Sequence, residues 1–375
     1  NVKVKKIKPT HTLSLINKEA FGTPPRLERE YKYSIILKDK SEKISLKKIG
    51  KIMQKALKEG LKKAKWSAPL QVKSSYWADE KVGEFLFRDI YFDTADWLCF
   101  KNNISYRYRN RFNNFSDYKK HLKYFWWPKY WPYRLEYQAK VNREELGRGY
   151  STVEEARFEF RKESKPFSLS YLPPLPPWPI KEFIAYFQNG TYKGLATYPA
   201  KSVINYLVKK GIKREQYEFN PSLVLITERL RQHLHLKTPW GSGPNPTQAF
   251  IISLDKSNIY PAKYYLEYLH LKELGVKGAR VPFPLGRLIE IEVEFERNVS
   301  ENLDKELLKA KAKGDIKRVE FLKKVISAFK EDQEEIMKIL QSEFSKQGIK
   351  IVPAVGSKYK QAMKVYINSP IFNAK

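Results

Sequence analysis

Charged and apolar residues alternate along several segments of this chain, and this alternation restricts the possible folds more than any other feature. Successive side chains of a β-strand point to opposite faces, so every second residue shares a face. In RLIEIEVEFER, residues 287–297, one face would carry Glu290, Glu292, Glu294 and Glu296. Four carboxylates on one strand face repel each other and need counter-charge. The pattern therefore predicts basic partners nearby, with an exposed acidic edge strand as the alternative.

Matching cations occur in other segments that alternate in the same way. The segment LEREYKY, residues 27–33, would place Glu28, Glu30 and Lys32 on one face. Four further segments have a charged face opposite a mainly apolar or aromatic one. Their charged faces carry Arg107, Arg109 and Arg111; Arg134, Glu136, Gln138 and Lys140; Arg157, Glu159 and Arg161; and Arg229, Arg231, His233 and His235.

Strands of this kind can close into a barrel in two ways. A barrel can be apolar inside and charged outside, or its charges can line the bore while helices cover an apolar exterior. Amphipathic segments at 44–66, 199–211 and 300–347 could supply such helices. We therefore predict an α+β fold: a closed antiparallel β-barrel of about eight strands with a charged bore, covered by inserted and C-terminal helices.

We predict that the 375 residues form one large domain rather than two. Residues 1–26 form a basic, proline-containing arm, and 27–365 form the barrel domain, with insertions near 40–83, 113–133 and 163–221. The region 300–347 is predicted to be helical, to break at Gly314 and to pack on the barrel. The segment YLPPLPPWPI, which ends at residue 180, predicts a polyproline connector.

The overall charge points to an anionic partner. The chain has 71 Lys and Arg against 41 Asp and Glu, a formal charge of +30, which suits nucleic acid, polyphosphate, nucleotides or an anionic surface. A generally lysine-rich proteome is the alternative cause. The single cysteine, Cys99, cannot form an intramolecular disulfide, so we expect a reducing compartment, the cytoplasm or an organellar matrix. No run of about 18 apolar residues is present, so we expect no transmembrane helix.

Several other chemistries find little support in the residues. The chain has no glycine-rich loop of the Walker type. Cys99 lies in the apolar context WLCF, which is typical of a core cysteine rather than a nucleophile. His233 and His235 have no partner motif that would complete a zinc site.

Five motifs, in order along residues 27–364, resemble the triphosphate tunnel metalloenzymes, or CYTH-like superfamily. EREYK has that family's Glu-x-Glu-x-Lys form, and IYFDTADWLCFKNNISYRYR is similar to its YFDT and Arg-x-Arg segment. IISLDKSNIY followed by LIEIEVEFE resembles its later Glu-x-Glu segment, and VGSKYKQAM resembles its closing element. The resemblance implies an eight-stranded tunnel that binds a triphosphate and one or two divalent ions.

The resemblance also implies roles for individual residues. The resemblance assigns catalytic roles to Glu28, Glu30, Glu290 and Glu292, and it assigns the binding of Mg²⁺ or Mn²⁺ to these four residues and Glu294. Phosphate binding falls on Lys32, Arg107, Arg109, Lys140, Arg229, Arg231 and Lys358. Asp93 and Thr94 are expected to hold the end of a strand, whereas Asp255 could serve either purpose.

Three classes of function remain open at this point. The leading hypothesis is a divalent-metal-dependent triphosphatase acting on inorganic triphosphate, a nucleotide or an RNA 5′-triphosphate. The second is a polyphosphate polymerase, similar to the catalytic domain of the vacuolar transporter chaperone complex, or a nucleotide cyclase. FIISLD lacks the arginine that polymerases usually keep before this element, and a run of glutamates replaces their usual lysine.

The third class is a non-catalytic component of a ribonucleoprotein, such as an organellar ribosome, that binds RNA through surface lysines. The basic helix at 44–66 and the aromatic segment KYFWWPKYWPY, residues 123–133, would both suit RNA. Each also has an ordinary structural explanation, as a solvated helix or as a loop that packs on its own domain.

Overall fold

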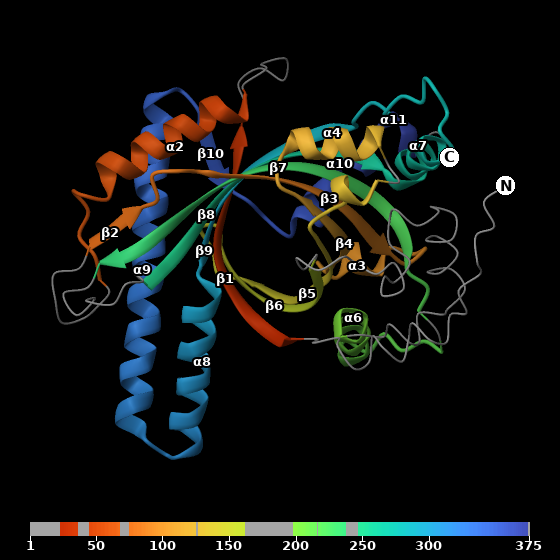
Figure 1. The fold of residues 1–375 in the computed structure, drawn as a ribbon. Helices are drawn as coiled ribbons and strands as arrows, with labels where there is room; N and C mark the ends of the chain where they lie inside the picture. Colours follow the sequence, from red (N-terminus) through yellow and green to blue (C-terminus); the bar gives the residue numbers. More distant parts are fainter. Residues whose placement is uncertain are drawn as a thin grey trace.

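Eight antiparallel strands close into a barrel in the computed structural model (Figure 1). Around the barrel the order is β1, β6, β5, β4, β3, β7, β8 and β9, and β9 pairs with β1 to close it. The strands are β1 (Thr23–Ile36), β3 (Gly83–Asp93), β4 (Ser105–Phe112), β5 (Arg134–Glu145), β6 (Tyr150–Arg161), β7 (Asn220–Lys237), β8 (Thr247–Pro261) and β9 (Gly286–Phe295). The predicted eight-stranded antiparallel barrel is confirmed.

The structure describes residues 23–36, 45–67, 75–124, 127–161, 198–215, 217–237 and 247–373. Two short strands extend the sheet beyond the barrel: β2 (Ser75–Ala78) pairs with β7, and β10 (Lys350–Pro353) pairs with β1. The predicted connector at 163–180 and residues 1–22 of the predicted arm lie outside the described residues. The structure begins β1 at Thr23, so Arg26, which we had placed in the arm, is part of the barrel.

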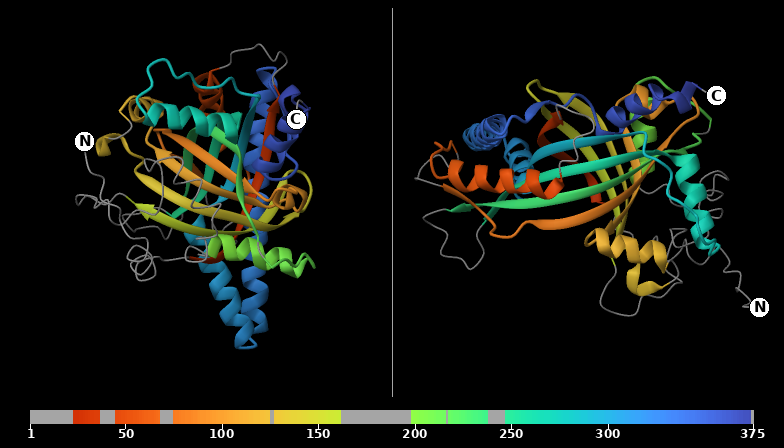
Figure 2. Two further views of the ribbon diagram at one scale, coloured as in Figure 1. Left: turned by 90° about the vertical axis from the view of Figure 1, so that its right-hand side faces the viewer. Right: turned by 90° about the horizontal axis from the view of Figure 1, so that it is seen from above.

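Helices surround the barrel on the outside (Figures 1 and 2). They are α2 (Leu46–Gly60), α3 (Leu98–Lys101), α4 (Phe115–Lys123), α6 (Tyr198–Lys209), α7 (Ala262–Glu273), α8 (Arg297–Ala312), α9 (Ile316–Lys346), α10 (Lys358–Ile367) and α11 (Pro370–Asn373), with a 3-10 turn η1 (Pro128–Tyr130). The three predicted helical regions correspond to α2, to α6, and to α8 with α9. None of the described helices is long and apolar enough to cross a membrane.

The apolar residues form two cores that lie between the barrel and its helices. In one core, α2 and α9 pack on each other and on β1, β8 and β9 through residues such as Met53, Ile336 and Ile291. In the other, α3, α6, α7 and α10 cover β3 to β5 and β7 through residues such as Leu207, Leu225 and Tyr359. This arrangement places the apolar strand faces outward, which leaves the charged faces to line the bore.

The helix α2 illustrates how the sequence produces this covering layer. Ile49, Met53 and Leu57 recur at helical spacing and are buried, while the other face is rich in lysine. The hydroxyl of Ser45 accepts a hydrogen bond from the backbone N–H of Lys48 and caps the first turn. A basic amphipathic helix therefore covers the apolar exterior of the barrel.

The C-terminal helices form a hairpin and then return to the barrel. Gly314, at φ +67°, separates α8 from α9, as the sequence predicted, because glycine adopts this left-handed conformation without strain. The hairpin extends well beyond the barrel in Figure 1. After α9 the chain forms β10 and then α10, which places Lys358 at one end of the bore.

Asp93 anchors the end of β3, as expected from the sequence. Its carboxylate accepts hydrogen bonds from the backbone N–H groups of Thr94, Cys99 and Phe100 at 2.7–2.9 Å. It also accepts one from the hydroxyl of Tyr359 in α10 at 2.9 Å. A single carboxylate therefore joins β3, α3 and α10, and so fixes the helix that carries Lys358.

We predict that Asp93→Ala destabilises the fold by about 3 kcal/mol, because buried donors would lose their charged acceptor. Urea unfolding would measure the change. Asp96→Ala is the matched control: Asp96 pairs with Arg214, but its side chain is 43% exposed, so we expect a loss below about 1 kcal/mol. Equal losses for the two variants would contradict the proposed anchor.

Candidate functional site

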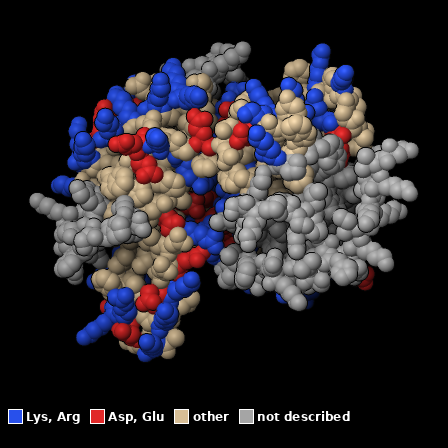
Figure 3. Space-filling model, viewed as in Figure 1, with Lys and Arg blue, Asp and Glu red and all other residues tan. Residues whose placement is uncertain are grey.

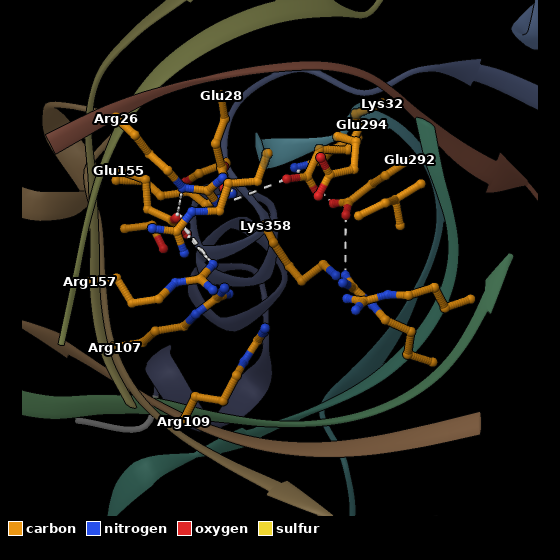
Figure 4. Close-up of a pocket in the computed structure, with 18 of the residues that line it drawn as sticks. Arg26, Glu28, Lys32, Arg107, Arg109, Glu155, Arg157, Glu292, Glu294 and Lys358 are labelled. Carbon is orange, nitrogen blue, oxygen red and sulfur yellow. Dashed lines mark hydrogen bonds and ion pairs between the residues drawn. The ribbon is translucent and has the colours of Figure 1, made fainter. Parts of the chain in front are cut away.

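A cavity of about 440 Å³ runs through the bore of the barrel (Figure 4). Basic residues from five barrel strands and from α8 and α10 line it, and glutamates gather mainly on the side formed by β1, β6 and β9. The basic lining residues are Arg26, Lys32, Arg107, Arg109, Arg111, Arg134, Lys140, Arg143, Arg157, Arg229, Arg231, Arg297 and Lys358. The acidic lining residues among the described part of the chain are Glu28, Glu155, Glu292, Glu294, Glu296 and Glu301.

At the end of the bore near α10, Lys358 lies between two carboxylates. Its ammonium group forms ion pairs with Asp255 and, at 3.0 Å, with Glu290. Asp255 also receives two hydrogen bonds from Arg229, at 2.6 and 2.5 Å. The pKa of Lys358 is raised: burial opposes its charge, but the neighbouring carboxylates favour it more strongly. Asp255 therefore lies in the wall of the bore beside Lys358 and Arg229, but it does not line the open cavity.

In the middle of the bore, Lys32 lies between Glu30 and Glu292. The distances from its ammonium nitrogen to the carboxylate oxygens are 3.3 and 3.1 Å. Arg143 pairs with Glu30 at 2.9 Å, and Arg229 reaches Glu292 at 3.2 Å. The register brings these groups together, because Lys32 faces Glu292 across the β1–β9 pair that closes the barrel.

At the opposite end of the bore, the guanidinium of Arg26 lies among three carboxylates. It contacts Glu28 at 2.6 Å and Glu155 at 2.7 Å, and Glu294 lies 3.9 Å away. Lys140 forms a further ion pair with Glu28. Burial and the neighbouring Glu155 raise the pKa of Glu28 to about 7, even though Lys140 and Arg26 act to lower it.

Arginines of β4 form the opposite wall and are held in place by buried acceptors. Arg109 donates two hydrogen bonds to Asp89 at 2.6 Å, and its guanidinium lies 4.3 Å from the ring centre of Phe87. Arg107 donates to the side chains of Gln138 and Tyr91. The bonds orient the guanidinium planes, which is the preorganisation that phosphate recognition requires.

Arg231 differs from the other predicted phosphate ligands. It lines the cavity and contacts the ring of Phe85, but it pairs with no carboxylate in the part of the chain that the structure describes. Burial and the nearby Arg229 and Arg111 lower the pKa of Arg231 to about 10. A half-buried cation that pairs with no carboxylate among the described residues favours an anion in the bore.

The bore thus gathers every predicted site residue, although Glu30 and Glu290 lie in its wall and do not line the open cavity. Sequence reasoning missed Arg26, Arg143, Glu155 and Asp89. Extending the alternation by two residues before Glu28 and before Arg157 would have found Arg26 and Glu155. Glu296 takes an additional role, because its carboxylate accepts hydrogen bonds from the backbone N–H groups of Asn298 and Val299 and caps α8.

The predicted metal ligands do not fit a divalent cation in the arrangement observed. Carboxylate oxygens are the ligands that Mg²⁺ and Mn²⁺ prefer. However, no three Asp, Glu, His or Cys residues of the described chain are grouped so that they could hold a metal. A basic side chain instead lies between the carboxylates at each level of the bore: Arg26, Lys32 and Lys358.

Basic side chains also lie on the outer surface of the molecule. Lys and Arg side chains are spread over much of the face in Figure 3, and acidic and basic residues lie side by side around a hollow near its centre. The outer charges are dispersed, whereas those of the bore are paired and convergent. A small polyanion would therefore be bound most specifically within the bore.

Comparisons with known proteins found similarity only among solved structures. No family model and no curated protein matches the chain. A Hippeastrum protein, described as an adenylyl cyclase candidate with a dominant triphosphatase activity, aligns at 14% identity over 90% of this chain and 95% of that chain, with a TM-score of 0.39. The RNA triphosphatase of S. pombe aligns at 13% identity over 92% of this chain and 96% of that one, with a TM-score of 0.31.

An adenylate cyclase candidate from Bacillus halodurans aligns at 14% identity over 77% of this chain and 91% of that chain, with a TM-score of 0.29. At these identities and scores, these structures assign neither a substrate nor an activity to this chain.

The buried ion pairs of the bore predict a specific dependence of stability on pH. Burial alone would raise the pKa of Asp89, but Arg109 and Arg107 lower it below its ordinary value. A lowered folded-state pKa stabilises the fold above the unfolded pKa, about 3.9, and this contribution is lost as pH falls through the folded value. We expect Asp89→Asn to cost about 3–5 kcal/mol at pH 7 and to flatten the loss of stability below about pH 4.

Urea unfolding at pH 3 to 7 would measure both effects. The control is Glu228→Gln, which breaks an ion pair with Lys256 whose glutamate side chain is 33% exposed, and it should cost less than about 1 kcal/mol. An unchanged pH profile in Asp89→Asn would contradict the prediction.

Proposed function

We propose that the chain is a triphosphatase that hydrolyses a phosphoanhydride of a triphosphate within the bore. The observation that carries this proposal is the set of basic side chains, contributed by β1, β4, β5, β6 and β7 and by α10, that line one cavity. Cations on several sides of the cavity suit a substrate with several phosphates rather than a single anionic group. Inorganic triphosphate, a nucleoside triphosphate and an RNA 5′-triphosphate all share this chemistry.

The residues of the bore would act mainly by binding and orienting the substrate. Arg107, Arg109 and Arg231 would contact phosphoryl oxygens from one wall, and Lys32 and Lys358 from the other side. A water oxygen would attack the terminal phosphorus, and the bridging P–O bond would break, its electron pair leaving with the diphosphate part of the substrate while the attacked phosphorus is released as inorganic phosphate. A carboxylate such as that of Glu292 would orient the water and accept its proton.

Dependence on Mg²⁺ or Mn²⁺ is part of the proposal and is supported by the resemblance of the motifs. The candidate ligands are the carboxylates Glu28, Glu30, Glu290, Glu292 and Glu294, once the basic side chains between them have moved. When bound, the ion would neutralise phosphoryl oxygens. Release of phosphate in Mg²⁺, in Mn²⁺ and in a chelator would test the requirement directly.

We predict that purified protein releases phosphate from tripolyphosphate, ATP or 5′-triphosphate RNA, and that Glu292→Gln lowers kcat at least 100-fold. The substitution keeps the shape of the side chain but removes the charge that lies between Lys32 and Arg229. Glu301→Gln is the matched control, because Glu301 also lines the cavity but pairs only with Arg297 among the described residues. No release from any substrate by the folded wild-type protein would refute hydrolysis.

An aromatic cluster favours RNA as a second candidate ligand. The rings of Trp127 and Tyr130 lie 6.3 Å apart at an interplanar angle of 7°, and Tyr124 lies 5.4 Å from Tyr130. Trp127 is 59% exposed. The insertion that carries the cluster connects β4 to β5, next to Arg111 and Arg134 of the cavity. Exposed rings beside a basic channel can stack nucleic-acid bases.

If RNA binds there, Trp127→Ala should weaken binding of a 5′-triphosphate oligonucleotide by about 1–3 kcal/mol and leave tripolyphosphate binding unchanged. Fluorescence anisotropy and competition would measure both. Phe115→Ala, which removes another exposed ring of the same insertion, is the control and should change neither. Equal losses of RNA affinity in the two variants would argue against stacking on the cluster.

A further inference from the structure

We propose that the loop between α7 and β9, residues 274–285, is a membrane-binding element that inserts the ring of Phe283 into an anionic lipid surface. None of the loop residues lines the cavity of the bore. The inference is therefore independent of the proposed function, and it concerns a part of the molecule that the sequence motifs do not include.

The first observation is a group of apolar side chains that the fold leaves in water. Phe283 is 94% exposed, the largest exposed fraction among the large apolar side chains that the structure describes. Three further apolar side chains of the same loop are also exposed: Leu274, Val276 and Val281. Single exposed apolar residues are ordinary on protein surfaces, but several within one loop mark an interaction site.

The fold holds the loop on both sides of Phe283. Ala279 and Leu285 pack against the apolar core beneath α7, and the backbone N–H of Leu285 donates a hydrogen bond to a carbonyl of β8 at 2.8 Å. Pro282 and Pro284 restrict the backbone next to Phe283, so little conformational entropy is lost when the ring is buried. The loop projects from the molecule beside α7 in Figure 1 and in the left-hand view of Figure 2.

The charge of the loop is complementary to an anionic surface. The sequence from Leu274 to Gly286 contains no acidic residue. Lys277 and Arg280 lie within it and are exposed, and Arg287, which is also exposed, follows in β9. An anionic bilayer attracts such cations to its surface, and the apolar region beneath its headgroups accepts an aromatic ring.

The apolar tip and its basic flanks together favour a lipid surface over other partners. An RNA backbone would use the cations, but it offers no apolar phase to Val281 and Phe283. A protein pocket would accept the ring, but it gives no general reason for the absence of acidic residues along the loop. A bilayer uses both features and requires no particular shape. The formal charge of +30 on the chain would add long-range attraction.

Sedimentation of the full chain with lipid vesicles would test this proposal. We expect binding to vesicles that contain phosphatidylglycerol, and binding at least tenfold weaker to vesicles of phosphatidylcholine alone. Phe283→Ser should weaken binding to the anionic vesicles at least tenfold, because the ring would no longer leave water. Leu308→Ser is the matched control, because Leu308 is 65% exposed but lies in α8, and it should change the affinity less than twofold.

A second pair of variants tests the role of the basic flanks. Replacing Lys277 and Arg280 together by Gln should lower the affinity for anionic vesicles about tenfold, because each cation near the surface contributes to attraction. Replacing Lys311 and Lys313 together by Gln removes the same charge from the α8–α9 hairpin, where both side chains are exposed. This control should change the affinity less than threefold.

A dye on the loop would separate insertion from electrostatic adsorption. Cys99 is fully buried, so a polarity-sensitive thiol dye would label only the cysteine introduced by Phe283→Cys. Its emission should shift to shorter wavelength on anionic vesicles, whereas a dye attached after Leu308→Cys should show no shift. No binding to anionic vesicles, equal losses in Phe283→Ser and Leu308→Ser, or binding without the emission shift would overturn the proposal. A protein or an RNA would then remain as the partner of the loop.

Discussion

The pairing of opposite charges inside the closed bore is the interaction on which the rest of this structure depends. An isolated ion loses several kcal/mol when it leaves water, so each buried acid needs a basic neighbour at hydrogen-bonding distance. Arg26, Lys32 and Lys358 meet this need at three levels of the bore, and each is shared by two or more carboxylates. The register between the barrel strands is therefore fixed by the pairing of buried charges as well as by the backbone hydrogen bonds of the sheet.

The same requirement explains why the molecule is apolar on the outside of its barrel and needs a surrounding layer of helices. Once the charged strand faces turn inward, the opposite faces expose residues such as Ile291 and Leu225, which α9 and the helices of the second core cover. Closing the sheet removes its free edges as well. Bore and helical layer are therefore two consequences of one alternating pattern.

The charged side chains of the bore could also exchange the partners with which they form ion pairs. Basic side chains that now neutralise glutamates have the donors that phosphoryl oxygens would use, and the glutamates have the oxygens that a divalent ion would use. A substrate that brings several phosphates would offer these basic side chains external acceptors in place of the glutamates. Arg231, half-buried and paired with no carboxylate in the described part of the chain, adds a net attraction for anions.

The sequence by itself determined which residues share a strand face, because the two-residue period of a strand is local and needs no tertiary information. It predicted the barrel, the break at Gly314, the anchoring role of Asp93 and the convergence of Glu30, Lys32 and Glu292. Only the tertiary structure decided which charges pair, since this depends on the register between strands that are distant in the chain. Glu155 pairs with Arg26, which lies 129 residues away in the sequence, and Lys358 of α10 pairs with Asp255, which lies 103 residues away.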